Sequence, residues 1–464
     1  MILPMLGVLL VFIFWFAILK RWQRGVVMLL AYLPFAGVVT LSFYPESYPI
    51  LFKDFFFVIP AYLAFWTVGR DKSSPVRVPQ AVRFAMLALA VLVLAQSFNP
   101  ELENLMVAAI GAKIWLFYLP LVYLAFELIR TRDDLVRLLR LMVALTWVPC
   151  TVGIVEWVAS MSFGYQETMY AIYGDAAEGA TQNFAVFSVG GEFYRIPSTF
   201  TFVAQYFAYT LAMVVPAYAL SRLDDSGFWR QVGWATMWLA VLASFMSGAR
   251  AAYLFMPMLL FFIYGLERGF TGAFKIAIML PPVLFAALYF AGISPGALFD
   301  LMRELLFMYS SDIAVQGLED AIDIAPLGTG TGMNTGAARY ALADPESMIG
   351  IENYYAKAVV ELGVIGLMAV VGLFIALLVR GYGIQRGLRD PGLRSCAIAI
   401  LAFLAMMVLN SFKGWLIDLD PINVYFWLFA GILLKLGHLE ATQPTANTRE
   451  TATPRHARVA AQRL

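Results

Sequence analysis

Apolar stretches recur along the whole chain and are separated by short polar turns. A helix needs roughly 20 apolar residues to cross the hydrocarbon core of a bilayer, and the chain offers about thirteen such stretches. Their centres lie near residues 11, 34, 59, 91, 117, 148, 209, 240, 258, 283, 367, 402 and 429. The pattern predicts an all-α polytopic membrane protein with roughly 12 to 14 spanning helices, forming one transmembrane domain over residues 1–436.

Two connections between the predicted spans are much longer than the rest. They cover about residues 159–197 and about residues 293–351. In the second, apolar positions at helical spacing predict an amphipathic surface helix over 298–309 and a further short helix over 313–324. Residues 328–332 alternate glycine and threonine, and we interpret this run as a flexible turn. Nucleotide binding is not predicted there, because no strand precedes the run and no phosphate-binding lysine follows it.

Composition supports the membrane assignment. The 464 residues are 61% hydrophobic and 14% charged, and the mean hydropathy is +0.76, more than one soluble core would need. The first apolar run lacks a preceding basic region and a following small-residue cleavage site, so we interpret it as a span and not as a signal peptide. Residues 437–464 are rich in Thr, Ala, Gln and Arg without an apolar period, which predicts a disordered tail.

Charge predicts the orientation. If thirteen spans alternate in direction, one set of connections and the tail carry 24 of the 32 basic residues. Basic residues concentrate on the cytoplasmic side of membrane proteins. We therefore expect an outside N-terminus, a cytoplasmic C-terminal tail and both long loops outside.

The chain has few residues suited to metal or redox chemistry. Cys150 and Cys396 fall in predicted spans without CxxC spacing, and His438 and His456 lie in or beside the tail. We predict neither a metal site nor a cofactor, and a catalytic base on the outer side must be something other than histidine.

Three segments place charged residues at span ends on the same predicted face. The first two are Tyr194–Phe200, which contains Arg195, and Ser247–Ala252, which contains Arg250. The third joins Pro326–Gly330 to the run from Glu352 to Leu367. Because all three lie outside in the predicted topology, they can converge on one pocket at the membrane boundary.

The residue types in these segments suit glycosyl transfer from a lipid-linked pyrophosphate. Guanidinium groups present a planar fork of donors to phosphate, so Arg195 and Arg250 are candidates to hold the leaving group. Glu352 is the candidate base for the attacking sugar hydroxyl. The alternatives are ordinary ones: an arginine that anchors a helix at the interface, and an acid favoured in the first turn of a helix.

Further charges lie in or next to apolar segments. Lys113 is a functional candidate for that reason, whereas Lys53 and Asp54 are explained more simply as a local ion pair. Nine residues beyond Glu352, Glu361 falls on the opposite side of the expected helix. We predict a packing or partner-binding role for Glu361, with Lys357 one turn earlier as its expected partner.

The order of these motifs resembles the O-antigen ligase and Wzy-type polymerase superfamily of bacterial envelope glycosyltransferases. The resemblance rests on Arg195-x-x-Ser-Thr-Phe, Ser247-x-x-Arg250, Pro326-Leu-Gly-x-Gly, and Glu352-Asn-x-Tyr followed by Glu361-Leu-Gly-x-x-Gly-Leu. Each motif alone is weak, whereas their order, spacing and common face make the set moderately specific. The match covers mainly residues 190–380.

The resemblance implies a metal-independent, GT-C-like transferase of the bacterial inner membrane that uses an undecaprenyl-pyrophosphate-linked glycan at its periplasmic face. Arg195 and Arg250 match positions that contact pyrophosphate in the superfamily. Asn353, Tyr354, Arg303 and Lys113 are further candidates for substrate binding. Expected partners are membrane lipid and the chain-length regulator and flippase of the same pathway, and no nucleic acid is expected.

One departure from the family pattern bears on the activity. Ligases of the family typically have His-Asn where this chain has Glu352-Asn353. This favours a polymerase of oligosaccharide repeat units for exopolysaccharide or O-antigen. A ligase that transfers glycan to a lipid or protein acceptor and a flippase for the same lipid-linked glycan remain the alternatives.

Overall fold

The computed structural model describes most of the chain, and every structural statement below concerns the described residues. These are 2–46, 48–69, 78–102, 104–188, 192–269, 271–275, 311–341 and 351–442, with isolated positions at 277, 278, 282, 296, 299, 300 and 303. The predicted span near residue 283 and most of the predicted amphipathic helix over 298–309 lie outside the described residues.

The described residues form an all-α polytopic membrane protein, as predicted. Eight of their helical segments are long and apolar enough to cross a membrane. These are α2–α3 (Trp22–Leu41), Tyr48–Thr67 with α4 (Ile59–Ala64), α6–α7 (Leu105–Leu128), α8 (Arg132–Phe163), α11 (Val203–Leu223), α17 (Tyr354–Gly387), α18 (Pro391–Asn410) and α19 (Ile422–Thr442). Shorter or less apolar helices occupy four more predicted spans: α1 (Ile2–Lys20), α5 (Gln80–Gln96), α12 (Gly227–Met246) and α13 (Ala252–Arg268).

Helix α11 forms the centre of the bundle. In its apolar window 89% of the residues are buried, and it packs against α8, α12, α13, α18 and α19. Close approach is possible because small residues line the contacts. At Gly233 of α12, for example, an added Cβ would lie 2.8 Å from the carbonyl oxygen of Ala217. Close packing of small residues is a main source of helix association in bilayers, where lipid removes the hydrophobic driving force.

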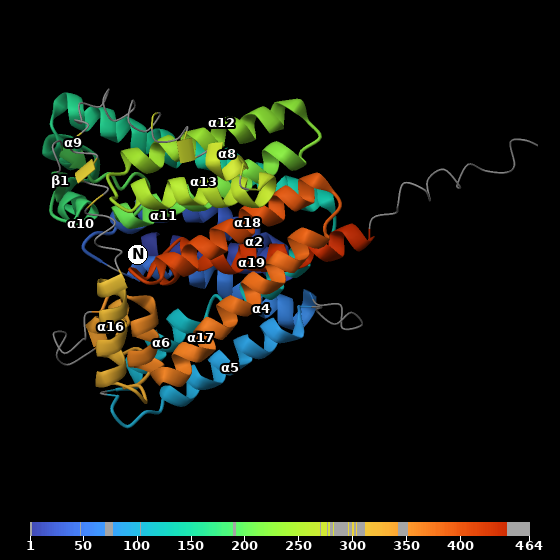
Figure 1. The fold of residues 1–464 in the computed structure, drawn as a ribbon. Coiled ribbons are helices and arrows are strands. Elements are labelled where there is room, and N and C mark those ends of the chain that lie inside the picture. The colour runs from blue at the N-terminus through green and yellow to red at the C-terminus, as the bar shows by residue number, and fades with distance from the viewer. Residues whose placement is uncertain are drawn as a thin grey trace, which may run out of the picture.

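The two long loops lie at the same end of the bundle. Figure 1 shows the first, with α9 (Tyr165–Tyr173), α10 (Ala177–Thr181) and the β1–β2 hairpin, at the end where α16 (Ser311–Ile324) lies. The hairpin pairs Val186–Ser188 antiparallel with Glu192–Tyr194. Helix α16 confirms the short helix predicted over 313–324. The C-terminal end of α19 lies at the opposite end of the bundle (Figure 1).

Helix α17 is broken at Gly363, where φ is +74° and ψ is 179°. The 326–332 loop inserts at this break: Val364 N donates to Pro326 O over 3.0 Å, and a Cβ on Gly328 would lie 2.6 Å from Gly363 N. The glycines at 328, 330 and 332 all have positive φ, which L side chains rarely adopt. The prediction of a flexible turn here is therefore wrong, because this loop is packed into the bundle and hydrogen-bonded to α17.

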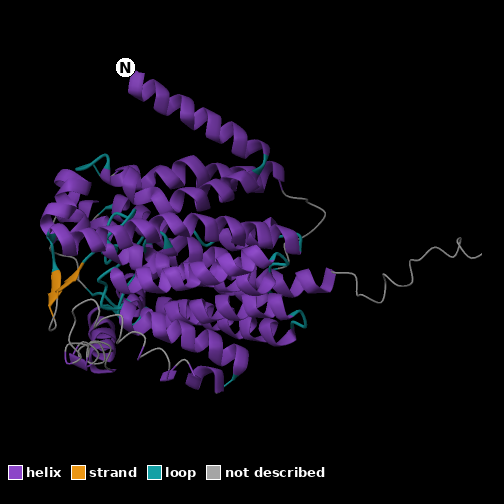
Figure 2. Cartoon of the chain, turned by 90° about the horizontal axis from the view of Figure 1, so that it is seen from above, coloured by secondary structure: helices purple, strands orange, loops and turns teal. Residues whose placement is uncertain are grey.

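The ends of the chain differ from the predicted boundaries. Helix α19 continues to Thr442, past the predicted tail boundary at residue 436, because Leu436 and Leu439 remain buried on the bundle. Residues 443–464 lie outside the described residues. Figure 2 shows that α1 projects away from the bundle, which it contacts chiefly through α2 and α4.

Candidate functional site

The segments that carry Arg195 and Arg250 meet at the end of the bundle where α9, α10 and α16 lie. Ile196 N donates a hydrogen bond to Ser247 O over 3.0 Å. Gly248 has a φ of +70°, and a Cβ there would lie 2.0 Å from Tyr194 O, so the contact requires glycine. Two of the three segments predicted to converge are therefore in contact, whereas their convergence with the Glu352 segment on one pocket stays a prediction.

The two arginines lie close enough to influence each other. Partial burial, and then the charge of Arg250, lower the pKa of the Arg195 guanidinium. The Arg195 side chain also donates to the amide oxygen of Gln182. Two like charges gathered in one place are unfavourable alone and are stabilised by an anion, so this arrangement suits a phosphate group.

The loop that presents Arg195 is held on several sides. Tyr165 donates its hydroxyl hydrogen to Arg195 O over 2.7 Å. Ser198 Oγ donates to Pro149 O over 2.7 Å, and Thr199 Oγ1 donates to Pro34 O over 2.5 Å. Ser198 has a φ of +53°, a strained conformation that these bonds hold in place. Loop rigidity of this kind is expected where a side chain must keep a fixed position.

Glu352 is accessible at the entry to α17. Its side chain is 74% exposed and bonds to Lys413 Nζ over 2.9 Å. Because Asn353 is the N-cap of the helix, Glu352 precedes it and is not a first-turn acid. Exposure leaves the carboxylate free to meet a bound substrate, and an exposed pair of this kind contributes at most about 1 kcal/mol to stability.

Asn353 and Tyr354 are built into the protein next to this carboxylate. The Asn353 side-chain oxygen accepts from Tyr355 N over 2.9 Å and from Ala356 N over 3.3 Å. Tyr354 is 4% exposed, and its ring packs against Trp115 and Phe374. In this geometry both residues fix the start of α17, so they position Glu352, and substrate contact by their side chains stays a prediction.

Lys113, which is 28% exposed, belongs to a network of charges inside the bundle. Its ammonium group lies 2.7 Å from Asp54 Oδ2. Lys53 contacts Asp54 at 3.4 Å, which confirms the predicted local pair, and also contacts Asp420 at 2.9 Å. Tyr118 donates to Asp54 Oδ1 over 2.5 Å. Sequence reasoning missed Asp420 because it is far away in the chain.

Arg303, the last candidate, is exposed, and its neighbours lie outside the described residues.

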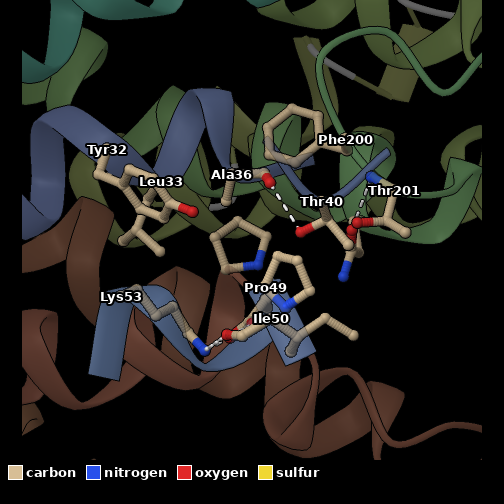
Figure 3. Close-up of a pocket in the computed structure, with 12 residues that line it drawn as sticks. Tyr32, Leu33, Ala36, Thr40, Pro49, Ile50, Lys53, Phe200 and Thr201 are labelled. Carbon is tan, nitrogen blue, oxygen red and sulfur yellow. Dashed lines mark hydrogen bonds and ion pairs between the residues drawn. The ribbon is translucent and has the colours of Figure 1, made fainter. Parts of the chain in front are cut away.

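A narrow recess connects this network to the arginine loop. Figure 3 shows Lys53 across the recess from Phe200 and Thr201, which follow Arg195 in the chain. Asp420 lines the same recess, and its Oδ1 has no hydrogen-bond partner among the described residues. The cavity volume is about 20 Å³, enough for one water molecule near that oxygen.

Glu361 is fully buried in the core, and its carboxylate accepts four hydrogen bonds there. Trp115 Nε1 and Gly332 N donate to Oε2 over 2.7 and 2.8 Å, and Asn334 N and Thr335 Oγ1 donate to Oε1 over 3.1 and 2.8 Å. These bonds confirm a packing role, and the carboxylate ties the 328–336 loop to α6 and α17.

The partner predicted for Glu361 is wrong. Lys357 pairs with Asp418, on the α18–α19 connection, and its ammonium lies 4.7 Å from the centre of the Trp115 ring. Burial raises the pKa of Asp418, against the effect of Lys357. The break at Gly363 and the inserted loop give Glu361 better donors than a neighbour on its own helix.

No family model matches the chain, and no curated protein matches it significantly. The functional assignment therefore rests on the motifs and on the geometry described above.

Glu361→Gln is predicted to lower the free energy of unfolding by about 2–3 kcal/mol. Both carboxylate oxygens accept from N–H groups, so the amide NH₂ of glutamine must face at least one donor, whichever way it is turned. Chemical denaturation of the purified protein in detergent measures the effect. The matched control is Glu352→Gln, the same change at the exposed end of the helix, which should cost less than about 1 kcal/mol. Equal losses in the two variants would contradict the role assigned to Glu361.

Proposed function

We propose that the protein polymerises oligosaccharide repeat units carried on undecaprenyl pyrophosphate, at the periplasmic face of the bacterial inner membrane. The observation that carries the proposal is the meeting of Arg195 and Arg250 at one end of the bundle, from motifs about 50 residues apart. A pair of guanidinium groups at the end of a membrane bundle suits a pyrophosphate whose isoprenoid chain lies in lipid.

The proposed reaction needs no metal. A sugar hydroxyl of the acceptor attacks the anomeric carbon of the donor, and the bond from that carbon to the pyrophosphate oxygen breaks. The hydroxyl proton passes to the Glu352 carboxylate. The electron pair leaves with undecaprenyl pyrophosphate, whose negative charge Arg195 and Arg250 stabilise. The new glycosidic bond joins the donor glycan to the acceptor glycan and so lengthens the polysaccharide.

The surroundings of Glu352 support its part in this scheme. The carboxylate is 74% exposed, so a substrate can reach it, and its ion-pair partner is Lys413, 2.9 Å away. Acidic solution tests this assignment, because a carboxylate base stays ionised in mild acid, where an imidazole base is protonated. The GT-C-like architecture, the outside N-terminus and the cytoplasmic tail belong to the same proposal.

A lipid-linked glycan flippase is the second candidate, because one observation favours it. Lys53, Asp54 and Lys113 place charges within apolar helices, and charges within membrane spans are often found along transport pathways. Deletion of the gene separates the candidates. Single repeat units on the outer leaflet would support a polymerase, units trapped inside would support a flippase, and long chains retained on the carrier would support a ligase.

In the deletion strain, wild-type protein should restore long polymer, whereas Glu352→Gln should lower its rate of synthesis by about 10²- to 10⁴-fold. The amide cannot take the hydroxyl proton. Gel analysis of chain length and yield, with expression matched by immunoblot, measures the effect. Glu101→Gln is the control, since this side chain is also exposed in a connection at the same end of the bundle. Unchanged polymer in the Glu352 variant would remove it as the base.

Arg195→Lys and Arg250→Lys should each lower polymer synthesis by about 10- to 100-fold at unchanged expression, because lysine keeps the charge but loses the fork. Arg230→Lys, an exposed change at the opposite end of the bundle, should leave synthesis unchanged. The rate of polymer formation in membrane vesicles is the measurement. Full activity in both arginine variants would argue against paired guanidinium contacts with pyrophosphate.

A further inference from the structure

Three arginines gather around a cleft at the end of the bundle opposite the proposed active site. Arg21 lies between α1 and α2, Arg24 lies in the first turn of α2, and Arg130 precedes α8. The cleft has a volume of about 390 Å³. All three side chains are exposed, and Arg24 makes a long bond of 3.4 Å to Ala17 O.

One acid, Asp134, lines the cleft beside the three arginines, so the cleft is positive on balance. Asp134 Oδ2 accepts from Thr131 N over 2.9 Å and from Arg130 N over 3.3 Å, and so caps α8. No ion pair of the described residues includes Arg21, Arg24 or Arg130. The cleft therefore sets three arginine charges against one carboxylate, one oxygen of which accepts two backbone hydrogen bonds.

The same cleft also has apolar walls. Val27, Met28 and Leu128 line it beside the arginines, and Val27 is 38% exposed. An occupant with both an anionic group and a hydrocarbon part matches this lining, whereas a free anion would leave the apolar wall unused. Basic pockets between membrane helices bind anionic lipid head groups in this way.

We propose that the cleft formed by Arg21, Arg24 and Arg130 binds the phosphate of an anionic phospholipid, whose acyl chains lie along Val27, Met28 and Leu128. The site would steady the contact between α2 and the α7–α8 connection. It does not depend on the proposed activity.

The test measures thermal unfolding of the full-length protein in detergent with added phosphatidylglycerol, phosphatidylcholine or inorganic phosphate. Phosphatidylglycerol should raise the unfolding temperature by several degrees, because a ligand of the native state stabilises it. The triple variant R21Q/R24Q/R130Q should lose this shift. The control R230Q/R389Q/R394Q makes the same change in net charge at exposed positions and should keep it. Equal shifts with phosphatidylcholine, with inorganic phosphate, or in both triple variants would overturn the proposal.

A separate observation concerns Glu156 in α8, which is 2% exposed and lies behind the Arg195 loop. Tyr173 Oη lies 2.6 Å from both Glu156 Oε1 and Ser198 O, and Ser198 N donates to Glu156 Oε2 over 3.0 Å. No ion pair found in the described parts of the chain includes Glu156.

The hydrogens of this ring can be counted. Tyr173 has one hydroxyl hydrogen and can donate it to one acceptor. If Glu156 were ionised, one of the two 2.6 Å contacts would join two acceptor oxygens with no hydrogen between them. With a proton on Oε1, the carboxyl donates to Tyr173, Tyr173 donates to Ser198 O, and Ser198 N–H returns to Oε2. Every donor and acceptor is then satisfied.

We infer that Glu156 carries a proton and acts as a positioning residue for the loop that presents Arg195. Glutamine has an NH₂ group where the acid has its O–H, so Glu156→Gln should preserve the ring. Glu156→Ala and Tyr173→Phe should both break it. The assignment of the proton is independent of the proposed function. The predicted effect on activity rests on the proposed function.

Infrared difference spectra between wild-type protein and Glu156→Gln should show the loss of one protonated carboxyl C=O band. Glu156→Gln should unfold within a few degrees of wild type, and Glu156→Ala and Tyr173→Phe should unfold earlier. In the polymer assay Glu156→Gln should rescue what Glu156→Ala loses. Absence of the carboxyl band from the difference spectrum would overturn the proton assignment. If the band is present but Glu156→Ala keeps full activity, the proton assignment stands and the positioning role is removed. Full activity in both the Glu352 and the Arg195 variants would instead count against the proposed function.

Discussion

The arrangement of the end of the bundle that carries the candidate site depends on the buried carboxylate of Glu361. A charge inside an apolar bundle is tolerated when hydrogen-bond donors surround it, and removal of such partners costs several kcal/mol. Here the donors come from Trp115 of α6 and from Gly332, Asn334 and Thr335 of the inserted loop. The need to supply these donors brings together α6, α17 and the polar 326–332 loop. It also fixes the start of α17, next to Glu352.

Other charged residues inside the bundle connect the Glu361 site to neighbouring helices. Trp115 donates to Glu361 and carries the Lys357 ammonium over its ring, while Lys113 and Tyr118, two and three residues away, reach Asp54. One short segment around α6 therefore contacts two charge clusters that involve different helices. Breaking a buried pair of this kind is far more costly than losing the exposed pair of Glu352 and Lys413. The network consequently acts as scaffold, and the exposed pair can change with little effect on the fold.

The apolar period and the charge bias were sufficient to predict the membrane fold, the grouping of the long loops and the meeting of Arg195 with Arg250. Each follows from a local pattern plus alternation of spans. Contacts between distant residues could not be predicted that way. Helical spacing pairs Glu361 with Lys357, but the break at Gly363 and the inserted loop supply other donors. The glycines of that loop suggested flexibility, whereas their positive φ values serve close packing.

Three glutamates at this end of the protein lie in three different environments. Glu156 is buried without a cation, and its hydrogen bonds close when it carries a proton. Glu361 is buried among four donors, so both its oxygens are occupied as acceptors. Glu352 is exposed and has one partner, the ammonium of Lys413. A general base must be reachable by substrate and not already saturated with donors. Of the three, Glu352 alone meets these conditions, so environment and not residue type selects the candidate base.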